Sequence, residues 1–280
     1  MKPHALWTFL ACVIAPASAD TVAINPSADN TLVQIADGSL SNGGDTGIFA
    51  GRTAQGVDSV RRGLLRFDVA AAVPAGATVT SASLTLYMSK TRSGTFPVAL
   101  HRLTRGWGEG TASGSGVGAP AQPGDATWLH SEFDTVLWSN EGGDFEPLSS
   151  ASLSISGGGY YTWTTNAALV ADVQSWLDQP NSAFGWILIG DEAVQPTSKR
   201  FESRESVFLE QRPLLTIEYE LPCPGDVDGD NDVDLSDLGA LLAGFGTQSG
   251  ATREQGDLNG DGAVDLSDLG ELLSQFGSSC

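Results

Sequence analysis

Basic residues are scarce in this 280-residue sequence, which has 14 Lys and Arg against 34 Asp and Glu. The formal net charge is −20, and no basic patch dominates any stretch. Proteins that bind nucleic acid through its phosphates need such a patch, so no nucleic-acid partner is expected. Hydrophobic residues make up 41% of the chain, as in ordinary globular proteins, which argues against disorder.

Long hydrophobic runs are also lacking. The run Ala5–Ile14 is too short to span a bilayer, and no later run is longer, so no membrane span is expected. Lys2 and His4 precede this run, and Ala17–Ala19 supplies small residues for cleavage. The pattern predicts a signal peptide over residues 1–19. The mature protein is therefore expected to be secreted and extracellular, with retention at the cell surface as an open alternative.

Only three cysteines are present. Cys12 weakly resembles a lipoprotein box, but Phe9 stands where such a box has Leu, so export and cleavage are favoured over lipidation. Cys223 and Cys280 then remain, and an oxidising compartment would let them form a disulfide. Two free thiols are the alternative.

Motifs for catalysis are missing too. The sequence has no G-x-S-x-G elbow, no metal-binding His pair and no Cys nucleophile. Acidic residues such as Glu109 could pair as in glycosidases, and a lyase using His, Tyr and Arg also stays open. An enzyme is not the favoured interpretation. If the chain is one, a polysaccharide lyase or O-glycosyl hydrolase is expected.

The sequence divides near Leu221, where two prolines end the last predicted strand and the composition turns to Asp and Gly. Residues 20–221 are predicted to be mainly β, because short segments rich in β-branched residues alternate with turn residues. The predicted strands are 62–69, 79–87, 98–103, 160–164, 185–189 and 214–219. One helix is predicted over residues 166–178, capped by Asn166. A β-sandwich or jelly roll with one packed helix is expected.

Several motifs of this part occur in a recognisable order. They are Ala28–Leu32, Gly47–Gly51, Arg62–Asp68, Ala77–Leu84, Trp107–Gly110, Arg200–Glu205 and Arg212-Pro213. Together they resemble DNRLRE (disaggregatase-related) domains across residues 20–221. The resemblance implies a β-sandwich and a carbohydrate-binding role, including the binding of uronate-containing polysaccharides.

A sugar site needs flat aromatic rings, and a uronate also needs Arg or Lys for its carboxylate. Arg105 and Trp107, in a segment leading to glycines, are the best candidates, with Trp128 as a further ring. The alternative is that these tryptophans belong to the hydrophobic core.

Residues 222–280 contain an acidic repeat, in which Gly225–Leu238 and Gly256–Leu269 match at a distance of 31 residues. Calcium binds oxygen ligands at positions 1, 3, 5, 7, 9 and 12 of such a loop. The predicted ligands are Asp226, Asp228, Asp230, Asp232 (carbonyl), Asp234 and Asp237, then Asp257, Asn259, Asp261, Ala263 (carbonyl), Asp265 and Asp268. Two Ca²⁺ ions are expected. Val233 and Val264, at position 8, are expected to pair the two loops through the core.

Position 6 of such a loop favours glycine, which the second loop has as Gly262. The first loop has Asn231, which tolerates left-handed backbone, so weakened rather than lost binding is expected there. The crowded carboxylates repel one another without metal, so folding is expected to depend on calcium.

Each loop leads into an amphipathic helix, and no helix is expected before either loop. Loop and helix together resemble a type I dockerin, in an all-α calcium-loop domain over residues 222–280. The resemblance implies a cohesin partner, bound through Leu235 and Ser236 in one repeat and Leu266 and Ser267 in the other. The alternative for the two leucines is burial at the helix starts.

The favoured interpretation is a secreted, non-catalytic polysaccharide-binding protein that is anchored or assembled through a calcium-dependent dockerin-like module. A polysaccharide-degrading enzyme that carries a dockerin is the second interpretation. A structural or adhesive surface protein is the third.

Overall fold

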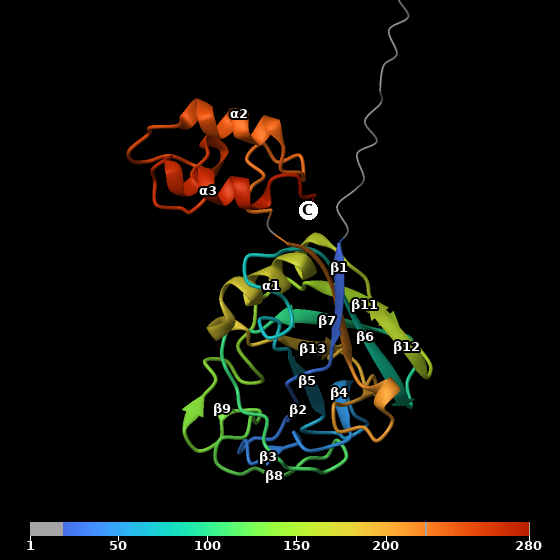
Figure 1. The fold of residues 1–280 in the computed structure, drawn as a ribbon. Coiled ribbons are helices and arrows are strands. Elements are labelled where there is room, and N and C mark those ends of the chain that lie inside the picture. The colour runs from blue at the N-terminus through green and yellow to red at the C-terminus, as the bar shows by residue number, and fades with distance from the viewer. Residues whose placement is uncertain (1–18, 222, 280) are drawn as a thin grey trace, which may run out of the picture. The chain divides into compact units, whose positions relative to one another are not determined.

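The computed structural model describes residues 19–221 and 223–279. These residues form two compact units, the β unit (residues 20–221) and the loop-helix unit (residues 223–279) (Figure 1). The predicted signal peptide falls on residues 1–19, of which 1–18 lie outside the described residues, as does Cys280 of the predicted disulfide. Within the two described ranges, no helix is long and apolar enough to cross a membrane.

The β unit is built on an eleven-stranded antiparallel sheet. Its main path runs β1-β15-β6-β14-β4-β5-β13-β7-β11, with β12 also paired to β6 and β2 also paired to β5. The strands are β1 Asp20–Ile24, β2 Ala28–Val33, β4 Gly47–Arg52, β5 Val60–Arg66, β6 Thr78–Thr91, β7 Phe96–Arg102, β11 Ala151–Ile155, β12 Gly159–Trp163, β13 Trp186–Gly190, β14 Lys199–Glu202 and β15 Leu214–Glu220. Two small ribbons join β3 Leu40–Ser41 to β8 Ala119–Pro120 and β9 His130–Glu132 to β10 Val136–Leu137. The predicted mainly β fold is confirmed.

Side chains of β6 alternate between the core and the outside, as a half-buried strand requires. The alternation slips by one residue between Val79 and Ala82, both of which are buried. The cause is a bulge: Glu218 of β15 faces Ser81 but Tyr219 faces Val79, which leaves Thr80 as an extra residue.

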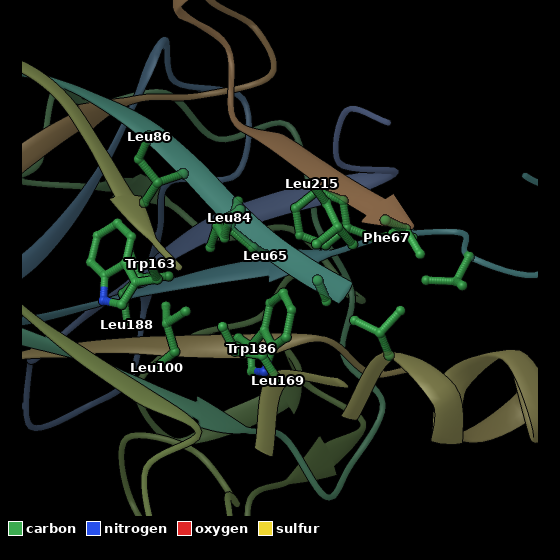
Figure 2. Close-up of a cluster of buried hydrophobic side chains, with 14 of the residues drawn as sticks. Leu65, Phe67, Leu84, Leu86, Leu100, Trp163, Leu169, Trp186, Leu188 and Leu215 are labelled. Atoms are coloured by element: carbon green, nitrogen blue, oxygen red, sulfur yellow. The ribbon is translucent and has the colours of Figure 1, made fainter. Parts of the chain in front are cut away.

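The main hydrophobic core joins strands that lie far apart in the sheet order (Figure 2). Leu84 and Leu86 of β6 belong to the same buried cluster as Leu65 of β5, Leu100 of β7 and Leu188 of β13. All five leucines are completely buried, so the sheet curls around this cluster. Truncating such a leucine to alanine typically costs about 2–5 kcal/mol of stability.

The predicted helix is confirmed as α1, Ala167–Asp178, with the Asn166 side chain capping its first turn. Its Trp176 packs edge-on against Trp186 of β13, with ring centroids 4.5 Å apart. Asp172, on the same helix, accepts hydrogen bonds from Trp186 Nε1 at 2.7 Å and from Ser150 Oγ at 2.5 Å. The helix is therefore joined to the sheet by both packing and buried hydrogen bonds. Pro180 follows and begins the short 3₁₀ helix η1, Pro180–Ser182.

A second, smaller core lies under the long segment between β7 and β11. Trp107, Trp128 and Trp138 from this segment pack with Leu64 of β5 and Ile187 of β13. Leu64 and Ile187 directly precede Leu65 and Leu188 of the main core in the sequence. Successive side chains of β5 and β13 therefore pack into different cores.

The loop-helix unit has two α-helices, α2 Leu235–Gly244 and α3 Leu266–Gln275, one after each acidic loop. The expectation that no helix precedes either loop is wrong for the second loop. The 3₁₀ helix η3, Arg253–Gln255, stands directly before it. Thr252 and Gln255 form a capping box there, which stabilises a single turn despite the polar sequence. A similar short turn in the β unit is η2, Leu209–Gln211.

Candidate functional site

Both acidic loops wrap around their first carboxylate. Asp226 accepts hydrogen bonds from the amides of Gly229 and Asn231, at 2.6 and 3.0 Å. Asp257 of the second loop accepts from the amides at the same two positions, at 2.9 and 2.8 Å. The sixth residue of each loop has left-handed backbone, with φ 70° at Asn231 and 85° at Gly262. Asn231 therefore adopts the conformation that glycine favours, as the sequence predicted.

The last carboxylate of each loop also begins the following helix. Asp237 is completely buried, and it accepts hydrogen bonds from the amides of Val227 at 2.6 Å and Asp234 at 2.8 Å. Together with Asp234 it forms a capping box at the start of α2. Asp268 has the same role at the start of α3. Loop and helix are thus one local unit, in which the helix start holds the position-12 carboxylate in place.

The first loop gathers its acidic side chains tightly. One carboxylate oxygen from each of Asp226, Asp228, Asp230 and Asp237 lies within 4.8 Å of the others. A second group of the same kind contains Asp237 with Asp232 and Asp234. Oxygens that share a calcium ion at 2.3–2.6 Å lie at most roughly 5 Å apart, so the first group fits the expected ligand shell. The second group contains the carboxylate of Asp232, for which the backbone carbonyl was the predicted ligand.

The second loop is less crowded, because Asn259 and Ala263 stand where the first loop has Asp228 and Asp232. Between residues 223 and 279, only first-loop side chains form groups of three or more acidic ligands at this spacing. The six predicted ligand positions of the second loop are still arranged like those of the first, with Asp261 accepting a hydrogen bond from the Ala263 amide at 2.8 Å.

Electrostatics differ between the loops. Partial desolvation and then repulsion from Asp230 and Asp237 raise the pKa of Asp228. The pKa of Asp232 is raised in the same way, by desolvation and by Asp230 and Asp234. For Asp268, burial alone would raise the pKa, but backbone hydrogen bonds outweigh it and hold the pKa below the usual value. The first loop therefore carries the stronger unbalanced repulsion, which a bound cation would relieve.

Val233 and Val264 are completely buried in one shared core, which joins the two loops as expected, while their backbone groups bond elsewhere. Val264 exchanges backbone hydrogen bonds with Gly246 and Thr247, just after α2. Val233 does so with Gly277 and Ser278, just after α3. Each loop is therefore tied to the end of the other repeat's helix, which gives the unit a twofold-like symmetry.

Two loop-helix units of this geometry, repeated at a fixed distance, are the marks of one known domain. Residues 224–276 match the dockerin type I domain. Type I dockerins bind calcium, and the aspartate groups of the first loop are compatible with this. The dockerin domain implies a cohesin partner and supports calcium-dependent assembly into a cohesin-bearing complex. Among curated proteins, nothing matches the chain. The dockerin match ends short of residues 20–221, so the DNRLRE resemblance stays a prediction.

The dockerin domain exposes the same residues twice. Leu235 and Leu266 are 73% and 74% exposed, and Ser236 and Ser267 beside them are exposed as well. The alternative that these leucines are buried helix starts is wrong. Further along the helices the exposed pairs are Leu242 with Leu273 and Phe245 with Phe276. Large exposed apolar residues at matching positions of two repeats indicate two similar interaction faces.

The candidate sugar-stacking rings of the β unit lie in its second core. Trp107 and Trp128 are 3% and 7% exposed. Trp107 donates its ring N–H to the Phe184 carbonyl at 2.9 Å, and the Arg66 guanidinium lies 5.1 Å from its ring centroid. The Arg62 guanidinium likewise lies over the Trp128 ring, 5.0 Å from its centroid. Neither ring offers an open face to a sugar, because packing under the long segment covers both.

Arg105 is partly exposed but its charge is balanced. Its Nε lies 3.0 Å from Asp144 Oδ2, in a shallow pocket of about 230 Å³. Asp144 in turn accepts hydrogen bonds from the amides of Ser139 and Asn140, at 2.8 and 2.9 Å. Burial opposes ionisation of Asp144, yet these bonds lower its pKa. The pair stabilises the turn at residues 139–144, which is a structural role.

A larger groove, which the sequence reading missed, lies beside β4, β14 and the end of β6. Its volume is about 700 Å³, and Phe49 lines it together with Lys90, Arg92 and Arg200. Arg200 bonds to Glu202 and to Ser89. The exposed side chains of Lys90 and Arg92 have no polar partner among the described residues. Lys90 and Arg92 lie just beyond the predicted strand 79–87, and their i, i+2 spacing was the available signal, since such residues of a strand face the same side.

Proposed function

We propose that this protein is a secreted, non-catalytic polysaccharide-binding protein that docks onto a cohesin-bearing partner through its calcium-loaded dockerin domain. The β unit holds an acidic polysaccharide, such as one that contains uronates. The two predicted loops each bind one Ca²⁺ through the side chains and carbonyls named above. The β unit takes the expected sandwich or jelly-roll architecture, with its curled sheet enclosing the main core.

The groove beside β4 and β14 is the observation that carries the polysaccharide part. Residues 20–221 have a net charge of −10, and their ten Lys and Arg side chains other than Lys90 and Arg92 all bond to polar groups of the described residues. Lys90 and Arg92 nevertheless stand together without a partner beside a mostly apolar groove. A sugar carboxylate would pair with their charges, while apolar lining such as Phe49 would accept the sugar's hydrophobic face. This site replaces Arg105, Trp107 and Trp128 as the proposed sugar contacts.

Export of the mature protein and a Cys223–Cys280 disulfide also belong to this proposal. Cys223 packs against the core of the dockerin domain, and Ser279, the neighbour of Cys280, bridges to Asp232. A disulfide that closes a loop of this length contributes up to about 4 kcal/mol by restricting the unfolded chain. It would suit an oxidising location outside the cell.

The test compares acidic and neutral polysaccharides as ligands of the full chain. We expect binding to acidic polymers that weakens as salt rises. The double variant K90A/R92A should lower the affinity about tenfold or more, since hydrogen bonds to charged groups contribute roughly 1.5–3 kcal/mol each. Affinity electrophoresis or calorimetry on alginate, with a neutral glucan beside it, measures this effect.

The matched control is R105A, which removes a partly exposed arginine from outside the groove and should leave the affinity unchanged. Reducing-sugar and unsaturated-uronate assays accompany the binding measurement. Release of either product would show an enzyme and contradict the non-catalytic proposal. Failure to bind any polysaccharide would favour the structural or adhesive alternative.

A further inference from the structure

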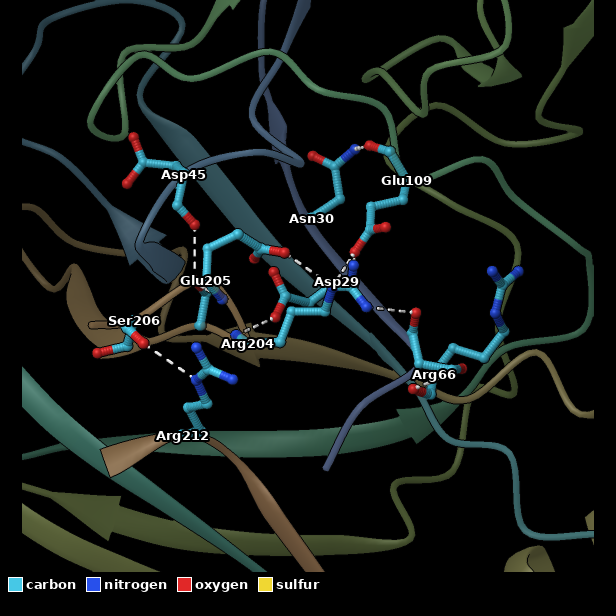
Figure 3. Close-up of polar contacts among 11 residues, drawn as sticks. Asp29, Asn30, Asp45, Arg66, Glu109, Arg204, Glu205, Ser206 and Arg212 are labelled. Atoms are coloured by element: carbon cyan, nitrogen blue, oxygen red, sulfur yellow. Dashed lines mark hydrogen bonds and ion pairs between the residues drawn. The ribbon is translucent and has the colours of Figure 1, made fainter. Parts of the chain in front are cut away.

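Three acidic side chains from distant parts of the β unit meet near the start of β2 (Figure 3). Asp29 lies on β2, Glu109 in the segment after β7, and Glu205 in the turn after β14. One carboxylate oxygen of each lies within 4.8 Å of the other two. Arg204 joins the group, with its Nε 2.8 Å from Glu109 Oε1 and 2.8 Å from Glu205 Oε1.

Arg204 does not provide a partner for every carboxylate oxygen of the group. Asp29 is completely buried, and its Oδ2 accepts a hydrogen bond from the Arg204 amide at 2.7 Å. Its other oxygen, Oδ1, is buried and has no hydrogen-bond partner, and the same holds for Glu205 Oε2. A buried carboxylate oxygen without a partner costs roughly 1–3 kcal/mol or more, so two of them in one cluster call for a missing positive group.

The charges within the cluster also indicate that a positive group is missing. The charge of Arg66 also acts on Glu109, but Arg66 donates to the Trp107 carbonyl and lies over the Trp107 ring. Burial, together with the repulsion from Glu205 and Glu109, raises the pKa of Asp29 well above its usual value. Burial also raises the pKa of Glu109. The cluster thus holds more negative charge than its arginines balance.

We propose that Asp29, Glu109 and Glu205 bind a calcium ion inside the β unit, with Asp29 Oδ1 and Glu205 Oε2 among its ligands. The donors are all hard oxygens, with no His or Cys among them, which favours calcium over transition metals. Ligands from a strand and two irregular segments suit the flexible shell of calcium better than the strict octahedron of magnesium. The ion would crosslink β2, the segment after β7 and the turn after β14.

The two dockerin loops also bind calcium, so the test silences them first. In the full chain, D237A/D268A removes the position-12 ligand of both loops. We expect this loop-silenced chain to retain about one calcium per molecule after equilibrium dialysis, measured by elemental analysis. Its unfolding is followed by tryptophan fluorescence, because every tryptophan after residue 19 lies between Trp107 and Trp186, within the β unit.

Calcium at about 100 times its Kd should raise the fluorescence-detected unfolding midpoint of the loop-silenced chain by roughly 5–10 °C over chelator. Adding D29N should abolish both the bound calcium and this shift, and E205Q should do the same if D29N fails to fold. D172N is the matched control, since it alters a buried aspartate outside the cluster. It should lower the midpoint but leave the calcium shift intact.

Two outcomes would overturn the proposal. The first is a loop-silenced chain that binds no calcium or melts at the same temperature with calcium and chelator. The second is a D29N variant that melts higher than its parent in both conditions, which would mean that Asp29 and Glu205 share a proton instead. Binding of polysaccharide at the groove is a separate measurement and decides neither outcome.

Discussion

Asn231 is the residue at which the two calcium loops differ most in backbone chemistry. It holds a φ of 70°, which glycine adopts freely and other residues adopt at a cost of roughly 1–2 kcal/mol, asparagine at less. We predict that N231G strengthens calcium binding at the first loop by less than about 1 kcal/mol, or up to fivefold. Calcium titration of the full chain, followed by calorimetry, measures the change.

The reciprocal variant G262N provides the control at the second loop. A side chain at position 262 would place its Cβ 3.2 Å from the Gly250 nitrogen, so this change should weaken binding more than N231G strengthens it. If both variants shift calcium affinity in the same direction, the backbone explanation for the difference between the loops is wrong.

The aspartate groups of the first dockerin loop could be predicted from the sequence, because they lie within one twelve-residue loop. The burial of Trp107 could not be predicted in this way. Its burial depends on the Phe184 carbonyl and the Arg66 guanidinium, which come from distant parts of the chain. The same holds for Asp29, whose neighbours Glu109 and Glu205 are 80 and 176 residues away in sequence. Spacing along the chain carries no signal for such contacts.

At the scale of elements, the six predicted strands are confirmed as β5, β6, β7, β12, β13 and β15, with shifted ends. The prediction continued β5 to Val69, but the strand ends at Arg66. Five strands of the main sheet were missed, namely β1, β2, β4, β11 and β14. The sequences of β2 and β14 are not alternating apolar patterns. β2 includes Asp29 and Asn30, which are completely buried and bond to the segment after β7. Tertiary contacts, not strand propensity, make these residues extended.

The helices α2 and α3 present two similar apolar faces, and we predict that either face alone supports cohesin docking. L235D or L266D should then weaken binding to a type I cohesin only about twofold, because one of two equivalent orientations remains. L235D/L266D together should weaken it by more than 100-fold, since a charge would enter an apolar interface on both faces. Surface plasmon resonance on immobilised cohesin modules would measure the three affinities.

L148D is the matched control for this series, because Leu148 is 86% exposed but lies in the β unit. It should bind cohesin like the parent chain. A single dockerin variant that removes all binding would show that one face does the docking and that the repeat is not functionally symmetric.

Over the whole molecule, the acidic charge is divided between two units that use it differently. Residues 222–280 have twelve acidic residues and one arginine, mostly within the two loops. In the β unit, five of the ten arginines are paired with acidic groups. Lys90 and Arg92 at the groove are not. Calcium is therefore expected to control docking, whereas polysaccharide binding should depend on salt.

Removing calcium from the full chain should separate these two activities. At 25 °C and neutral pH, a chelator should abolish cohesin binding and reduce the far-ultraviolet helical signal, because the repelling aspartates of both loops no longer hold the starts of α2 and α3. Polysaccharide binding at the groove should persist, because its cations need no metal and the β unit, which loses only the stabilisation from its proposed calcium, stays folded at 25 °C. Added calcium should restore docking and helix content, whereas magnesium at the same concentration should not.

Helix content that is unchanged by the chelator would contradict the assignment of the loops as calcium sites. Loss of polysaccharide binding together with docking would place the sugar contacts in a calcium-dependent part of the chain instead of the groove.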